Sequence, residues 1–175
     1  MRFTGLVALL LALAAPGAQP PKTAISRASL APIESGFDAR ISKAGQADPF
    51  DLLGNTRGVY LDGYGVVFST ELNLIVAPAI TPFRPTISKE VVEAVHRRKL
   101  AKLDVLKKAM REMLTSSAAA LDTLPPSSQV VLAVTLFYYS WEQRAGLPSQ
   151  IVMRAPRSAL LRGDALEASL RVEEF

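Results

Sequence analysis

The stretch SKEVVEAVHRRKLAKLDVLKKAMREMLTSSAAALD, which runs from Ser88 to Asp122, decides how the rest of this chain can fold. It contains neither proline nor glycine, and it lies between Pro85 on one side and Pro125 and Pro126 on the other. Proline lacks the backbone N–H and is excluded from helix interiors, so it collects just outside helix ends. The stretch is therefore predicted to be one long α-helix, with Ser88 able to cap its first turn.

One face of this predicted helix is mostly apolar. Its members recur at steps of three or four, as a 3.6-residue repeat requires, and they are Val92, Val95, Lys99, Leu103, Leu106, Met110, Met113, Ser117 and Leu121. Such a face needs a layer to pack against. Two strand-like stretches, residues 66–76 and residues 130–139, flank the helix in sequence and are the candidates for that layer.

These stretches and the shorter segments around them predict an α+β fold. Residues 66–76 alternate with a period of two, whereas residues 130–139 are apolar on both sides and predict a central strand covered on each face. A capped helical turn is expected at 48–54, a return strand at 151–155, a short helix from Arg157 to Arg162 and a last strand at 166–173. The predicted domain is an antiparallel sheet of four to five strands with the one long helix packed on one face.

The chain divides into three predicted parts. Residues 1–17 have the features of a signal peptide, with Arg2 before an apolar run at 6–14 and small residues before a cleavage site at Ala18. An uncleaved anchor is the alternative, although a bilayer span needs about 20 apolar residues. Residues 18–47 are predicted to be a flexible, mostly disordered linker, with a short helix near 37–43 as the alternative, and residues 48–175 form a single domain. This organisation predicts an exported protein, either periplasmic or secreted.

The composition excludes some kinds of chemistry. The chain has no cysteine, one histidine and a formal net charge of +4. Thiol catalysis and thiolate metal sites are therefore excluded, and His96 has no second histidine with which to share a metal ion. We expect neither a metal site nor a cofactor. The modest positive charge favours anionic partners without identifying one.

A row of basic side chains on the long helix is one candidate binding surface. The residues concerned are Arg97, Arg98, Lys108 and Arg111, of which Arg97, Lys108 and Arg111 fall on one side, opposite much of the apolar face. Such a row could bind an anionic component of the cell envelope or an acidic protein, or it could simply be a solvated face. Nucleic acid is not expected, because no aromatic residue lies among the basic ones to stack on bases.

Two further segments contain candidate binding residues. In the first, glycines flank Tyr64 on both sides and Asp62 precedes them, which suits either a close approach to a ligand or a structural turn. In the second, Tyr139 and Trp141 follow the apolar stretch 130–139 and could line a groove or close the core.

The sequence contains no recognised catalytic motif, so a non-enzymatic binding domain of the cell envelope is the first functional prediction. A hydrolase acting on envelope material is the alternative, in which Asp62 would face Glu71 or Glu142 across a cleft as an acid and base pair. A structural or assembly subunit that pairs through its last strand is the third possibility.

Overall fold

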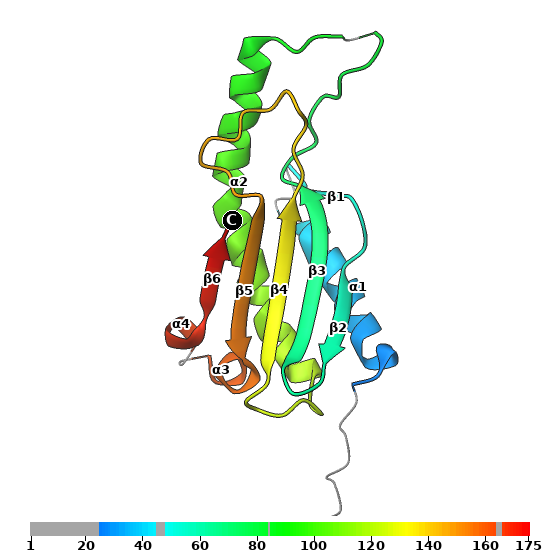
Figure 1. The fold of residues 1–175 in the computed structure, drawn as a ribbon, viewed down its shortest axis with the longest axis vertical. Helices are drawn as coiled ribbons and strands as arrows, with labels where there is room; N and C mark the ends of the chain where they lie inside the picture. The colour runs from blue at the N-terminus through cyan, green and yellow to red at the C-terminus, as the bar shows by residue number, and fades with distance from the viewer. Residues whose placement is uncertain (1–24, 45–47, 84, 164–165) are drawn as a thin grey trace, which may run out of the picture.

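A six-stranded sheet backed by two helices forms the core of the molecule, as a computed structural model shows for residues 25–44, 48–83, 85–163 and 166–175 (Figure 1). In chain order the elements are α1 (Arg27–Lys43), β1 (Asp51–Leu52), β2 (Arg57–Leu61), β3 (Gly65–Asn73), α2 (Lys89–Ala120), β4 (Gln129–Leu136), β5 (Gln150–Pro156), α3 (Arg157–Arg162), α4 (Leu166–Ser169) and β6 (Arg171–Glu174). The strand order is β1-β3-β4-β5-β6, and β2 also pairs with β3.

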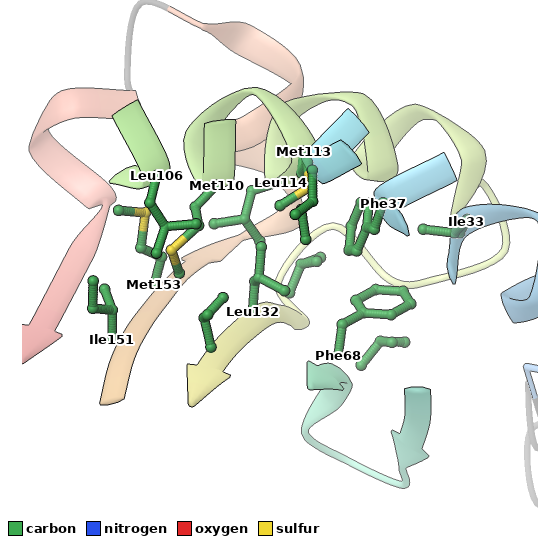
Figure 2. Packing of buried hydrophobic residues seen from close by; sticks show 14 of the residues in the cluster. Ile33, Phe37, Phe68, Leu106, Met110, Met113, Leu114, Leu132, Ile151 and Met153 are labelled. Atoms are coloured by element: carbon green, nitrogen blue, oxygen red, sulfur yellow. The ribbon is translucent and has the colours of Figure 1, made fainter. Parts of the chain in front are cut away.

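Helix α2 confirms the prediction of one long helix. It spans 32 residues, and the side chain of its N-cap Ser88 accepts a hydrogen bond from the backbone N–H of Val91. Of the nine residues predicted for its inner face, eight are buried and Val92 is half-buried. The α2 side chains drawn in Figure 2 point toward Leu132 and its neighbours in the sheet, so the apolar face packs on the strands as expected.

The sheet is mixed, so the prediction of a wholly antiparallel sheet is wrong. Strands β3 and β4 run parallel, with Phe68 opposite Leu132, and the other pairings of the described strands are antiparallel. The reason is the connection between them. Helix α2 returns the chain along the sheet, so β4 starts at the same end as β3 and runs in the same direction (Figure 1).

The prediction of a flexible linker at 18–47 is wrong for residues 27–43, which form helix α1. Four apolar side chains, Leu30, Ile33, Phe37 and Ile41, are buried along this helix. The rings of Phe37 and Phe68 pack edge to face, with 4.9 Å between their centroids, so α1 completes the core beside α2 (Figure 2). The predicted signal peptide at 1–17, and residues 18–24 and 45–47, lie outside the described residues.

The turn predicted at 48–54 is not helical. Phe50 enters the core, and the two residues of β1 pair with Leu72 and Asn73 at the end of β3. Burial of the phenylalanine and pairing with an existing strand outweigh the local helix signal.

The C-terminal predictions have different outcomes. The return strand and the short helix from Arg157 to Arg162 are confirmed as β5 and α3. The strand predicted at 166–173 is correct only in its second half, because α4 occupies Leu166–Ser169 before β6 begins. Likewise β3 ends at Asn73, three residues before the end of the predicted strand.

Both α1 and α2 lie behind the sheet, and the opposite face of the sheet is turned toward the viewer in Figure 1. On that face of β4, Ala133 is half-buried and Thr135 is exposed. The described elements therefore cover β4 on one face only, which corrects the prediction of a strand covered on each side. No helix in the described part of the chain is both long enough and apolar enough to cross a membrane.

Candidate functional site

A row of five side chains crosses the open face of the sheet from one edge to the other. The strand register aligns Val59 of β2, Val67 of β3, Val131 of β4, Arg154 of β5 and Arg171 of β6. Residues aligned in this way point to the same side of a sheet, and neighbouring strands lie about 4.8 Å apart. The open face thus has an apolar half and a cationic half.

The cationic half borders a hollow of about 510 Å³ at the end of the sheet where β3 and β4 begin. Its walls come from the β2–β3 turn, from the strands β4, β5 and β6, and from α4. The lining residues are Tyr64, Gln129, Arg154, Pro156, Ala168, Ser169 and Arg171. Polar groups that can donate hydrogen bonds therefore surround a cavity large enough for a small ligand or one or two side chains.

The glycines beside Tyr64 hold it at this place. Gly63 has φ of 74°, as the tight turn requires, and Gly65 has φ of 143°. A Cβ atom on Gly65 would lie 1.9 Å from the carbonyl oxygen of Gln129, so no other residue fits where β4 passes the turn. The backbone N–H of Gln129 also donates to the carbonyl of Tyr64 at 2.9 Å. The glycine pattern therefore serves the packing of the turn against β4, and it places Tyr64 at the hollow.

The charges of the described residues that line the hollow do not balance. Arg154 forms an ion pair with Glu173 at 2.7 Å. A side-chain hydrogen bond with Tyr64, together with the attraction of Glu173, raises the pKa of Arg154 above its ordinary value. Arg171 is exposed and forms no ion pair with the described residues, although it lies directly opposite Arg154. Two like charges aligned across strands repel each other, so this pair leaves one positive charge uncompensated.

The basic side chains of α2 differ from those at the hollow, because carboxylates lie close to them. Arg97 pairs with Glu93 at 3.9 Å, and Arg98 pairs with Asp48 at 2.9 Å. Both cations thus have local partners.

A groove of about 730 Å³ runs along α2 between α1 and α4 and contains the other two basic candidates, Lys108 and Arg111. Its lining includes four cations, and four carboxylates lie among them or pair with them: Arg40, Lys107, Lys108 and Arg111 against Asp104, Glu112, Glu167 and Glu174. The described residues therefore give the groove no net charge with which to attract an anion.

The loop that joins β4 to β5 contains Tyr139 and Trp141. Their rings are stacked, with centroids 6.0 Å apart, and both residues are half-buried. Beneath them Glu142 forms an ion pair with Lys99 of α2, and the two side chains are 1% and 0% exposed. Burial lowers the pKa of Lys99, and the attraction of Glu142 offsets only part of that effect. This cluster fastens the loop to α2, and the buried ion pair has no access to solvent.

The structure separates the carboxylates that the predicted hydrolase requires. Asp62 is exposed at the β2–β3 turn, and Glu71 lies six residues along β3 from Gly65, roughly 20 Å away. Glu142 is buried beyond the opposite end of β4. Neither proposed acid and base pair meets across a cleft. Among the described residues, no group of three or more His, Asp or Glu side chains is placed to hold a metal ion.

Of the eight candidate residues from the sequence, only Tyr64 lines the hollow, and Asp62 lies on the same turn. Arg154 and Arg171 were not among the site residues predicted from the sequence. A visible signal for Arg154 was a single charge within the otherwise apolar strand at 151–155. Comparison of the chain with family models, with curated proteins and with solved structures finds no match.

Proposed function

We propose that this chain is a non-enzymatic binding domain and that the open face of its sheet receives an apolar segment of a protein partner that also contains carboxylates. The observation that supports the proposal is the aligned row of Val59, Val67, Val131, Arg154 and Arg171. If the N-terminal segment is an export signal, the partner is a protein of the cell envelope.

The apolar half of the row supports an apolar contact. A parallel strand pair is normally covered on both faces, and no described element covers this face of β3 and β4. Val59 is 55% exposed. Full burial of a valine contributes about 1.5 to 3 kcal/mol, so covering the exposed half of Val59 would contribute roughly 1 kcal/mol. Val67 is half-buried and would add less, and Val131, which is only 6% exposed, would add almost nothing.

The cationic half supports the acidic character of the partner. Arg57, Arg154 and Arg171 face outward on the described strands, and the register places the carboxylates Asp51, Glu71 and Glu173 on the same side. The charges are distributed unevenly, because Arg154 and Arg171 lie directly opposite each other on β5 and β6, where Glu173 is the one carboxylate that the described strands place on this face. Complementary charge accelerates association and selects acidic partners over basic ones.

A photocrosslinking amino acid at position 67, expressed in the native host, tests this proposal. We expect a covalent adduct with one protein, through a peptide that contains apolar and acidic residues. The substitution Val59→Asp should reduce the yield, because it removes roughly 1 kcal/mol of burial and adds a charge that repels carboxylates, which together weaken binding about five- to thirtyfold.

The matched control places the same crosslinker at Val105, an exposed valine on α2. Equal adducts from positions 67 and 105 would show nonspecific contact. An adduct that is unchanged by Val59→Asp, or a crosslinked peptide without carboxylates, would also refute the proposal.

A further inference from the structure

We infer that the hollow bordered by Tyr64, Arg154 and Arg171 is a carboxylate-binding site, in which the two guanidinium groups hold one carboxylate attached to an apolar group. This inference rests on the proposed function and specifies which group of the partner the hollow receives.

The arrangement of the arginines indicates an anion. Arg154 and Arg171 are directly opposite in the antiparallel pair of β5 and β6, where Cα atoms lie about 4.5 to 5.5 Å apart. Their repulsion works against the pairing of an edge strand only four residues long. Guanidinium groups are well suited to a planar carboxylate, because each offers parallel N–H donors. An anion between them would turn a repulsive contact into a bridge.

The charge balance distinguishes a carboxylate from a phosphate. Glu173 already compensates one guanidinium, so one positive charge remains among the described residues at the hollow. A carboxylate supplies one negative charge, whereas a phosphate monoester supplies about 1.5 to 2 and would leave an excess of negative charge beside Glu173. The site therefore fits a carboxylate better.

The remaining walls indicate what is attached to the carboxylate. Tyr64, Gln129 and Ser169 supply neutral hydrogen-bonding groups, and Pro156 and Ala168 supply apolar surface. A branched aliphatic chain on a carboxylate can extend from the arginines over the apolar walls that Pro156 and Ala168 supply.

Amide and arginine Nε NMR spectra of the full chain test the inference, with 4-methylpentanoate as the probe at low ionic strength. We expect saturable shifts at Gln129, Ser169 and the two arginine Nε groups, with a dissociation constant in the millimolar range. Binding should weaken at least tenfold in Arg154→Gln and in Arg171→Gln, and about threefold in Tyr64→Phe. Acetate should bind more weakly than 4-methylpentanoate, and the neutral amide 4-methylpentanamide should not bind.

The matched control is Lys108→Gln, which removes an exposed cation from the balanced groove on α2. Affinity for 4-methylpentanoate should not change in this variant. An equal loss in Lys108→Gln, shifts that never saturate, or tighter binding of methyl phosphate would each overturn the inference. Unchanged amide spectra far from the hollow show that each variant is folded.

A second copy of the chain is the competing partner for Arg171. If two β6 strands paired antiparallel about Val172, Arg171 of each copy would face Glu173 of the other. Sedimentation over a range of protein concentrations distinguishes the two cases. A dimer that is abolished by Arg171→Gln, together with no response to 4-methylpentanoate, would overturn the inference.

The crosslinking experiment and the NMR experiment test the two proposals separately, so either proposal can be refuted without the other. Loss of the NMR response with the Val67 adduct intact would refute the carboxylate site and leave the binding face in place. Loss of the adduct with the NMR response intact would refute the protein partner and leave a site for small carboxylates.

Discussion

Removing the carboxylate from the buried Lys99 and Glu142 pair should destabilise the protein strongly. The two side chains are 0% and 1% exposed, so neither charge can be hydrated when its partner is removed. Glu142 also accepts a hydrogen bond from the backbone N–H of Tyr139 at 3.2 Å, and the Lys99 ammonium donates to the carbonyl of Phe137 at 3.3 Å. Breaking one side of such a pair costs about 3 to 5 kcal/mol. For a domain of this size that corresponds to a decrease of roughly 6 to 20 °C in the unfolding midpoint.

Urea unfolding of the wild type, Glu142→Gln, Lys99→Met and the double variant that combines these two substitutions measures this effect. We expect each single substitution to cost about 3 to 5 kcal/mol and the double variant to recover most of the loss, because it leaves no buried unpaired charge. The pKa of Lys99 is lower in the folded than in the unfolded state, so the wild type should gain stability as pH rises toward the unfolded value of 10.5. Additive costs, or a cost below about 1 kcal/mol for Glu142→Gln, would refute a buried coupled pair.

Three further substitutions test other parts of the fold. Gly65→Ala should cost more than about 3 kcal/mol in urea unfolding, because its Cβ would overlap the backbone of β4, whereas Gly54→Ala, with open space around it, should change stability by less than about 1 kcal/mol. Phe37→Ala should cost about 3 to 5 kcal/mol by leaving a cavity under α1, and a cost as small as that of the exposed Leu100→Ala would show that α1 does not belong to the core. Hydrogen bonding to Arg27 is the main cause that lowers the pKa of Glu34, so the stability that this carboxylate provides above pH 4.5 should disappear as pH falls from 4.5 through its folded pKa. Glu34→Gln should flatten the dependence of unfolding free energy on pH below 4.5, and an unchanged slope there would contradict the prediction.

Features encoded within one segment could be predicted from the sequence. The prolines around α2 and the spacing of its apolar residues predict its existence, its ends and its buried face. The short helix α3 could also be predicted, because Pro156 precedes its first residue and Gly163 follows its last. In these segments the local pattern and the tertiary contacts agree.

Helix α1 was missed although a signal was present. Leu30, Ile33, Phe37 and Ile41 recur at helical spacing, but Pro32 and the small residues among them favour an irregular segment. Burial of four large side chains against the sheet and α2 overrides that preference. The parallel pairing of β3 and β4 could also have been predicted, since a strand, a long helix and a strand in succession indicate a crossover.

The candidate site could not be predicted, because it depends on register. Arg154 and Arg171 become neighbours only when β6 pairs with β5 at one particular offset. A shift of β6 by one residue would turn Arg171 to the helix side of the sheet. Nothing in either strand alone determines that offset, whereas the glycines around Tyr64 could at least be recognised as a turn.

The parallel pairing at the centre of the sheet has a consequence for how the chain is synthesised. Phe68 and Leu132 are some 64 positions apart, and bringing the ends of such a loop together costs roughly 4 kcal/mol of chain entropy. In the nascent polypeptide, one edge of β3 therefore has unpaired backbone groups, and the apolar face of α2 is exposed, until β4 has left the ribosome. Translational pausing before codon 129 would prolong that exposure. Chaperones bind exposed apolar surface, so we expect them to bind most during this interval.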